Sequence, residues 1–333
     1  MPDQTAGNAP PTDRAWDDPH PGRLVIALAG NPNSGKTTVF NAITGAHQHV
    51  GNYPGVTVEK KEGTARVDGT LVHVVDLPGT YSLTAYSLEE LVARDFVIEE
   101  KPDVVVHVVD ASNLERNLYL TTQFIELGVP TVVALNMFDL AQSQGKIIDV
   151  AMLSELMGVP MVPTVGTREE GIEELLRTAV AVAREGRGPS KPLRYGRELE
   201  EHIEEIVALI EHSPALGGLP PRWVAIKLLE NDQQVTGRIR DRLAEGEWLL
   251  ARVEQVRAHL EQVIGDDPEM ALADRRYGFV HGACAEALTT TQARRIDWSE
   301  AIDNVITSRL LGLPFLLLMM WGMFELVFRL GAP

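Results

Sequence analysis

The stretch Gly30-Asn-Pro-Asn-Ser-Gly-Lys-Thr-Thr38 decides the fold, because it matches the pattern G-x-x-x-x-G-K-[ST] of a phosphate-binding loop, or P-loop. An apolar run over 24–29 precedes it and suits a buried strand, and 38–43 can open a helix. Such a turn between a strand and a helix presents a row of backbone N–H donors to a polyphosphate. The sequence therefore predicts a nucleotide site here rather than an incidental glycine-rich turn.

Each position of this loop has an expected task. Lys36 should reach the β and γ phosphate oxygens, and the Thr37 hydroxyl should bind Mg²⁺. The two glycines let the backbone pass close to the phosphates, since no Cβ obstructs it. The nucleotide contacts that we expect from the loop are Gly30, Asn31, Pro32, Asn33, Ser34, Gly35, Lys36, Thr37 and Thr38.

The length, net charge and cysteine content of the chain limit the classes of function that it can have. A chain of 333 residues suggests two or three domains, and its net charge of -17 argues against a nucleic-acid partner. The single cysteine, Cys284, excludes an intramolecular disulfide, fits a reducing compartment and is expected to be a small buried residue. Residues 1–22 are polar and rich in Pro and Asp, so we expect a disordered arm and no secretory signal.

A second motif follows at a strand end. Paired strands are predicted over 56–67 and 70–76, because Asp68-Gly69 between them is a type I′ hairpin signal. The second strand leads into Asp76-Leu-Pro-Gly79, a D-x-x-G pattern. An acid there can hold a metal-bound water, and the Gly79 N–H can sense a γ-phosphate. We expect nucleotide contacts from Asp76, Leu77, Pro78 and Gly79.

A third motif predicts which base is bound. The strand 131–136 delivers Asn136-Met-Phe-Asp139, an N-x-x-D pattern. The Asp139 carboxylate can accept hydrogen bonds from N1–H and the amine of guanine, whereas adenine would leave it unpaired, so GTP is favoured over ATP. The alternative is a helix N-cap. A backbone N–H of the loop 165–168 could contact the guanine carbonyl, and the expected base contacts are Asn136, Met137, Asp139, Gly166, Thr167 and Arg168.

The rest of the chain predicts an α/β domain over 23–186 and a small helical domain over 193–290. Further strands are expected at 103–110 and 159–164, helices at 87–100, 114–127, 150–157 and 169–184, and a loop at 44–55. This alternation indicates a mostly parallel sheet covered on both faces. After the Gly/Pro linker 186–192 the strands should cease, with helices at 197–212, 221–231, 237–264 and 269–289 and with Trp223 and Trp248 in the core.

The C-terminal segment is strongly apolar. Residues 310–328 contain one charge, Glu325, and lie between Arg309 and Arg329. We predict a linker over 291–308 and a membrane helix over 309–330, with everything upstream in the cytoplasm because arginines precede the helix. A buried core helix or an amphipathic docking helix is the alternative. Glu325 could be an ion-pathway carboxylate or could reach the membrane edge.

Taken together, these motifs closely resemble the FeoB family of bacterial ferrous-iron transporters, over roughly residues 23–330. The segments that carry the resemblance are Gly30–Thr38, Gly55–Glu59, Asp76–Leu83, Val109–Leu118, Asn136–Asp139 and Trp223–Glu230. The resemblance implies a Ras-like P-loop GTPase domain, a helical domain that modulates nucleotide affinity, and a membrane domain mostly absent here. It also implies the bacterial inner membrane, with these domains facing the cytoplasm.

The resemblance also assigns residues. Thr57 looks like the switch I threonine that binds Mg²⁺, with neighbouring contacts expected from Gly55, Val56, Val58 and Glu59. Asn33 matches the asparagine that family members use to hold K⁺. Thr80 stands where Ras-like proteins have a water-positioning glutamine, and no arginine is obviously placed to act within the chain, so K⁺ could neutralise the developing charge instead. The resulting assignments are catalytic Asn33, Lys36, Thr57 and Gly79, Mg²⁺ at Thr37, Thr57 and Asp76, and K⁺ at Asn33.

The resulting hypothesis is a GTPase that gates or drives Fe(II) uptake, with GTP/GDP, Mg²⁺ and K⁺ as cofactors. Switch I (about 45–55 with Thr57) and switch II (from Thr80) would order on the γ-phosphate. Expected partners are the membrane domain, the bilayer and small cytosolic accessory proteins, with a homo-oligomer possible and no nucleic acid. The alternatives are a soluble regulatory GTPase acting on ribosome or tRNA, and a scaffold that binds GTP without turnover.

Two local features stay open in the sequence. Relatives often have serine where Gly166 stands, so guanine affinity could rest on backbone groups and nucleotide release could be fast. His47 and His49 form an H-x-H pattern that could bind a transition metal, although loop histidines are more often solvated.

Overall fold

The computed structural model describes residues 24–45, 47–53, 56–84, 87–211, 216, 218–243, 245–290 and 312–330. The chain forms two compact units, 1–290 and 291–333. Among the sequence-based expectations, the disordered arm over 1–22, the linker over 291–308 and the contact at Gly55 lie outside the described residues. The domain boundaries drawn from the sequence stay a prediction.

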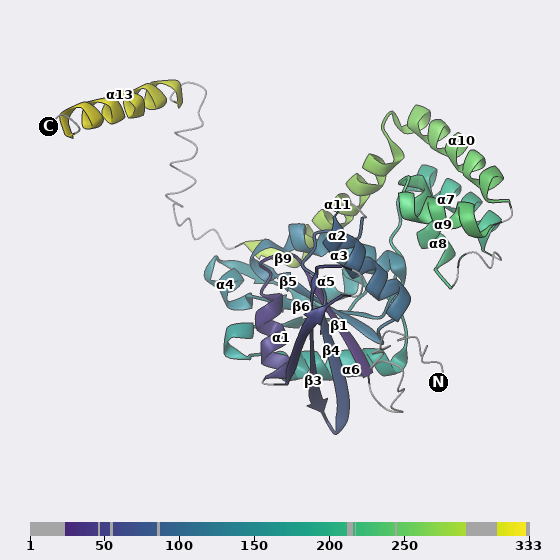
Figure 1. Cartoon of the computed structure of the whole chain (residues 1–333), viewed down its shortest axis with the longest axis horizontal. Helices are drawn as coiled ribbons and strands as arrows, with labels where there is room; N and C mark the ends of the chain where they lie inside the picture. Colours follow the sequence, from purple (N-terminus) through teal and green to yellow (C-terminus); the bar gives the residue numbers. More distant parts are fainter. Residues whose placement is uncertain are drawn as a thin grey trace, which may run out of the picture. The chain divides into compact units, whose positions relative to one another are not determined.

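The first unit is built around a seven-stranded sheet in the order β2-β3-β4-β1-β5-β6-β8 (Figure 1). Strands β1, β4, β5, β6 and β8 are parallel, and β2 and β3 are added antiparallel at one edge. Their bounds are β1 Leu24–Gly30, β2 Gln48–Asn52, β3 Glu59–Val67, β4 Thr70–Asp76, β5 Val104–Asp110, β6 Thr131–Asn136 and β8 Met161–Pro163. The mostly parallel α/β sheet expected from the sequence is confirmed.

Helices connect these strands and form the segment after residue 186. In the sheet-containing part they are α1 Lys36–Thr44, α2 Leu88–Asp95 with a π-helical extension Phe96–Glu100, α3 Leu114–Leu127, α4 Phe138–Ser143, α5 Val150–Met157 and α6 Ile172–Glu185, with 3₁₀ turns at Ala111–Asn113 and Gly166–Arg168. The helical segment contains α7 Arg197–Ile210, α8 Pro221–Leu229, α9 Gln233–Arg242, α10 Gly246–Ile264 and α11 Pro268–Ala287.

Both faces of the sheet are buried, because successive side chains of the parallel strands alternate between two cores. Ile26 and Leu28 pack with residues of α1 and α6 on one face. Ala27 and Ala29 lie on the other face, in a core that includes α3 and the helical segment. This alternation explains why β1, β5 and β6 read as continuous apolar runs in the sequence.

Several local signals in the sequence act as expected. Asp68 and Gly69 both have positive φ, 47° and 80°, as a type I′ turn requires between β3 and β4. Ser87 caps α2 through a complete capping box with Glu90. Gly128 ends α3 in the left-handed conformation, at φ 71°.

The structure corrects four expectations. The segment 44–55, expected to be a loop, contains β2, which is exposed along its length and held by main-chain pairing to β3 rather than by burial. The helix expected over 237–264 is two helices, α9 and α10. Strands do not cease after the linker, because β9 Leu288–Thr290 pairs with β7 Lys146–Ile148. Trp248 is 58% exposed, so only Trp223, at 1%, is a core residue.

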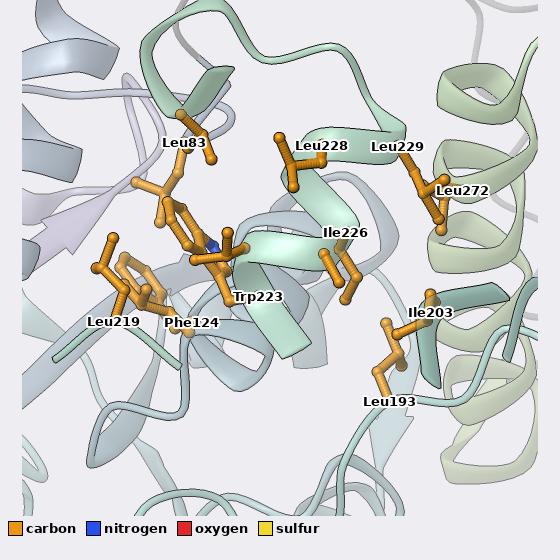
Figure 2. Packing of buried hydrophobic residues seen from close by; sticks show 14 of the residues in the cluster. Leu83, Phe124, Leu193, Ile203, Leu219, Trp223, Ile226, Leu228, Leu229 and Leu272 are labelled. Atoms are coloured by element: carbon orange, nitrogen blue, oxygen red, sulfur yellow. The ribbon is translucent and has the colours of Figure 1, made fainter. Parts of the chain in front are cut away.

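The helical segment shares its apolar core with the sheet-containing part. Trp223 of α8 lies beside Leu219 and Phe124, with Leu83 close by (Figure 2). Phe124 belongs to α3 and Leu83 to the segment after β4, so one core holds residues from both halves of the unit. A movement of the segment after β4 would therefore change the packing around Trp223.

A buried ionic cluster crosses the same boundary. Arg276 of α11 contacts both carboxylate oxygens of Glu126 on α3, at 2.5 and 2.9 Å. Its Nη1 lies 2.5 Å from Glu230, whose other oxygen lies 2.7 Å from Lys227. Burial alone would lower the pKa of Arg276, but Glu126 and Glu230 outweigh it and hold the pKa well above its ordinary value. The Tyr195 hydroxyl also donates to Glu126.

The second unit contains α13 Gly312–Leu330. In the part of the chain that the structure describes, no helix combines the length and the hydropathy that a bilayer span requires. The last two turns of α13 carry a Glu325–Arg329 ion pair. The membrane helix expected over 309–330 is therefore not confirmed.

Candidate functional site

All sequence motifs meet at one edge of the sheet, where the parallel strands end. The P-loop follows β1, the D-x-x-G motif begins at the last residue of β4, and the N-x-x-D motif begins at the last residue of β6. Because β4, β1, β5 and β6 are neighbours in the sheet, their carboxyl ends lie side by side. This edge is where open α/β sheets bind ligands.

Asn136 ties three of these loops together. Its Nδ2 donates to the Ser34 carbonyl at 3.0 Å, and its Oδ1 accepts from the Gly166 N–H at 2.9 Å. The side chain is 3% exposed, so both bonds are shielded from water. The sequence indicated Asn136 as a base contact, which stays a prediction, and in the structure its side chain joins the P-loop to the loop 165–168.

The two P-loop glycines are required by close contacts. Gly35 has φ 82°, and a Cβ there would lie 2.3 Å from the Asn136 Nδ2. At Gly30 a Cβ would lie 2.6 Å from the Val108 carbonyl oxygen. Any larger residue would push the loop away from β5 or break the bond that Asn136 makes.

The phosphate end of the site holds a close pair of opposite charges. The Lys36 ammonium donates to the Asp76 carboxylate, and both side chains are largely buried. Burial raises the pKa of Asp76, and Lys36 offsets part of that rise. The Thr80 N–H donates to the Gly30 carbonyl at 3.1 Å, so the start of switch II is fastened to the P-loop. Gly79 also lies near this loop, since a Cβ there would lie 3.4 Å from the Pro32 backbone nitrogen.

The base end of the site contains Asp139, in the first turn of α4. Its carboxylate is about half exposed and accepts a hydrogen bond from Arg168, which also lies 3.5 Å from Glu170. Met137 precedes α4 in the left-handed conformation. The acid thus lies beside the loop 165–168, as the sequence predicts, and it pairs with Arg168 of that loop.

Gly166 is enclosed by the helix that follows the P-loop. A Cβ there would lie 3.2 Å from Val39, 3.3 Å from Thr38 and 3.4 Å from the Asn136 Oδ1. A serine would therefore require its neighbours to shift by a few tenths of an ångström. Thr167, next to it, is exposed.

Switch I is anchored by a residue that the sequence did not single out. The Tyr53 hydroxyl donates to the Asp76 carbonyl at 3.1 Å, and its ring is 6% exposed. Burial, together with the charges of Asp76 and Glu62, raises the pKa of Tyr53 far above its usual value. The available signal was a large aromatic residue in the stretch 47–55, whose other apolar side chains are only Val50 and Pro54.

The candidate metal ligands are oxygen donors of the kind that Mg²⁺ and K⁺ accept. Thr37 and Thr57 are exposed, Asp76 is buried beside Lys36, and Asn33 is exposed with φ 69°. Val56, Val58 and Glu59 flank Thr57 at the start of β3. Among the described residues, no group of three or more His, Cys, Asp or Glu could hold a metal, and His47 and His49 are both exposed.

Polar residues that the sequence did not indicate join the segment after β4 to α3, and join α2 to the helical segment. Gln123 of α3 accepts from the Leu83 N–H. Arg94 of α2 is fully buried and donates to Asp232 at 2.6 Å and to Gln234, both at the start of α9. In the sequence Arg94 looks like a solvated residue on the surface of a helix, so only the fold shows that it is buried and paired.

Comparisons with known proteins agree with this geometry. The family model described as "Ferrous iron transport protein B" matches residues 24–179, and the model "FeoB cytosolic helical domain" matches residues 195–289. The Fe(2+) transporter FeoB of Salmonella typhimurium is 41% identical over 316 residues, which cover 93% of this chain and 39% of the relative. A fusion protein of Porphyromonas gingivalis, "Fe(2+) transport protein A/Fe(2+) transporter FeoB", is 43% identical and covers 92% of this chain and 37% of its own length.

Solved structures match as well. A GDP-bound A143S mutant of the S. thermophilus FeoB G-domain is 40% identical, with a TM-score of 0.72 over 80% of this chain and 100% of that one. The cytosolic domain of the T. maritima FeoB iron transporter in its GMPPNP form is 34% identical, with a TM-score of 0.69 over 80% of this chain and 99% of that one. The chain spans somewhat over a third of the length of the curated relatives it matches.

Proposed function

Because the chain belongs to the FeoB family, we propose that it is the GTP-binding and GTP-hydrolysing part of a ferrous-iron transporter. The observation that carries the proposal is the Asn136 bridge, which holds the P-loop and the loop 165–168 together beside Asp139. A triphosphate on the P-loop and a guanine on Asp139 would then fit one continuous site. The GDP and GMPPNP complexes of the related domains support this assignment.

The roles follow from the chemistry of the residues. Lys36 and the P-loop N–H groups would neutralise the phosphates, and the Gly79 N–H would contact the γ-phosphate. Thr37, Thr57 and Asp76 would hold Mg²⁺, which when bound neutralises charge between the β and γ oxygens. The Asp139 carboxylate would pair with guanine once Arg168 has moved off it, because Arg168 and guanine would both donate hydrogen bonds to this carboxylate.

The hydrolytic step needs positive charge beside the phosphates, and Asn33 supports a potassium site there. Its positive φ and exposed side chain make the amide oxygen available at the outer edge of the P-loop. K⁺ when bound would supply charge that an arginine supplies in other GTPases. Asn33 itself would only hold the ion.

The decisive experiment is GTP turnover in potassium and in sodium, for the wild type and for Asn33→Ala. We expect faster hydrolysis in potassium for the wild type and no difference between the salts for the variant. Equal wild-type rates of hydrolysis in both salts would contradict the proposed potassium site. Binding of GTP with no phosphate release in either salt would favour a scaffold over an enzyme.

We also propose that the chain acts at the bacterial inner membrane, where GTP hydrolysis gates or drives Fe(II) uptake. The names of the relatives and the exposed apolar side chains of α13 support this. Co-flotation with neutral phosphatidylcholine liposomes, lost on deletion of 309–333, would be expected. Recovery of the whole chain in the liposome-free fraction would contradict it.

The fusion relative from P. gingivalis supports a small accessory protein as partner, since there the two are one polypeptide. The rival reading, a regulatory GTPase acting on ribosome or tRNA, is not favoured. A net charge of -17 would oppose binding to a polyanion.

A further inference from the structure

The segment 109–118 resembles the family strongly, yet none of its residues has a role in the proposed site. In the structure it forms the end of β5, a 3₁₀ turn and the first turn of α3. A cavity of about 160 Å³ opens between this segment and the P-loop. Its walls include Asn31, Tyr81, Asp110 and Arg116.

Among the described residues that line this cavity, Arg116 is the only cation, and it contacts both the P-loop and Tyr81. Its guanidinium carbon lies 4.6 Å from the centre of the Tyr81 ring, in a cation–π contact. Its carbonyl accepts from the Asn31 side chain at 3.4 Å. Tyr81 follows Thr80, whose N–H is bound to the Gly30 carbonyl. Arg116 therefore links the P-loop to the first residues of switch II.

The position of Arg116 in α3 does not by itself favour an arginine. Arg116 lies in the first turn of α3, where the helix dipole favours acidic side chains over basic ones. Among the residues that the structure describes, no carboxylate lies within ion-pair distance of its guanidinium. The Asp110 carboxylate in the same cavity is engaged by the backbone and hydroxyl of Ser112. Within the described part of the chain, the contact that remains for the Arg116 side chain is the Tyr81 ring.

We propose that Arg116 is a positioning residue that holds switch II against the P-loop through Tyr81 and thereby sets the rate of GTP hydrolysis. The inference rests on the proposed GTPase function and deepens it. Both side chains are exposed, so the contact can break and re-form without disturbing the core. Losing it should slow the step that needs an ordered switch II and leave GDP binding unchanged, since GDP has no γ-phosphate for that switch to contact.

The test is a double-mutant cycle on Arg116→Ala and Tyr81→Ala, with kcat and KM for GTP in potassium and the Kd for GDP. An exposed cation–π contact is worth a factor of about two to five. We expect each single variant to lower kcat by that factor, the double variant to lower it no further, and the Kd for GDP to stay within twofold. Tyr81→Phe keeps the ring and should match the wild type, and Arg116→Lys should recover part of the loss.

The matched control is Arg177→Ala, which removes an exposed arginine of α6 that pairs with Glu173. It should leave kcat unchanged. Additive losses in the double variant, or a parallel loss of GDP affinity, would overturn the proposal. A loss of 100-fold or more in Arg116→Ala but not in Tyr81→Ala would also overturn it, because the guanidinium would then act on the phosphates directly. A wild type without GTP turnover would instead refute the proposed function.

Discussion

The buried cluster of Glu126, Arg276, Glu230 and Lys227 should make the helical segment and the sheet-containing part unfold together. All four side chains are at most 4% exposed, and the cluster holds two acids and two bases. Arg276→Met keeps most of the volume of the side chain but leaves a net charge of one in the core. Removing one partner from a buried ionic set costs about 3–5 kcal/mol, so the free energy of unfolding should fall by that amount.

The assay is urea unfolding followed by tryptophan fluorescence, to which Trp223 at the shared core contributes, and by far-UV circular dichroism. Coincident transitions would confirm that the unit unfolds cooperatively. Arg240→Met is the control, because Arg240 pairs with Glu247 on the surface at 3.0 Å. An exposed pair is worth about 1 kcal/mol or less, so this variant should stay close to the wild type.

A second substitution separates charge from packing. Arg276→Met combined with Glu126→Gln leaves Lys227 paired with Glu230 and restores charge balance in the core. The double variant should therefore recover about 1–3 kcal/mol relative to Arg276→Met alone. The reasoning is refuted if Arg276→Met lies within about 1 kcal/mol of the wild type, or if the second substitution adds its own loss.

Three further predictions test the packing and the titration of the unit. Burial alone would raise the pKa of Glu230, but Lys227 and Arg276 outweigh burial and lower it. The ionised carboxylate therefore stabilises the fold above the usual carboxyl pKa, and the free energy of unfolding should fall as pH drops from 5 to 3. Urea titrations at each pH measure this, and a flat profile would contradict it. Burial raises the pKa of Cys284 to about 12, so iodoacetamide at pH 8 should label the native chain far more slowly than the chain in urea, and equal rates would show the thiol to be accessible. Trp223→Ala should lower the free energy of unfolding by about 3–5 kcal/mol, and a loss under about 1 kcal/mol would mean that Trp223 is not central to the shared core.

The sequence predicted the elements that local signals define. The P-loop, the hairpin at Asp68-Gly69, the capping box at Ser87 and the end of α3 at Gly128 each depend on residues close together in the chain. The motifs could be assigned to strand ends as well, because alternating strands and helices predict parallel strands whose carboxyl ends share one edge of the sheet.

What the sequence could not show are contacts between distant segments. β2 is exposed on every residue and is recognised only by its pairing with β3. Asn136 was indicated for the base, and its bridge to Ser34 spans 102 residues. Arg94, Glu126 and Arg276 carry charges that suggest a surface, but their partners lie up to 150 residues away in the chain.

The apolar composition over 309–330 indicated a membrane span, whereas the described residues contain no helix that combines the length and the hydropathy of one.

The central claim is that a P-loop site selects guanine through the Asp139 carboxylate, and calorimetric titration tests it most directly. The wild type should bind GDP about 100-fold or more tightly than ADP, since adenine leaves the carboxylate unpaired. Xanthine has a carbonyl where guanine has its amine, so Asp139→Asn should shift the preference from GDP to XDP. Equal affinities of the wild type for GDP and ADP, or an Asp139→Asn variant that still prefers GDP, would contradict the account.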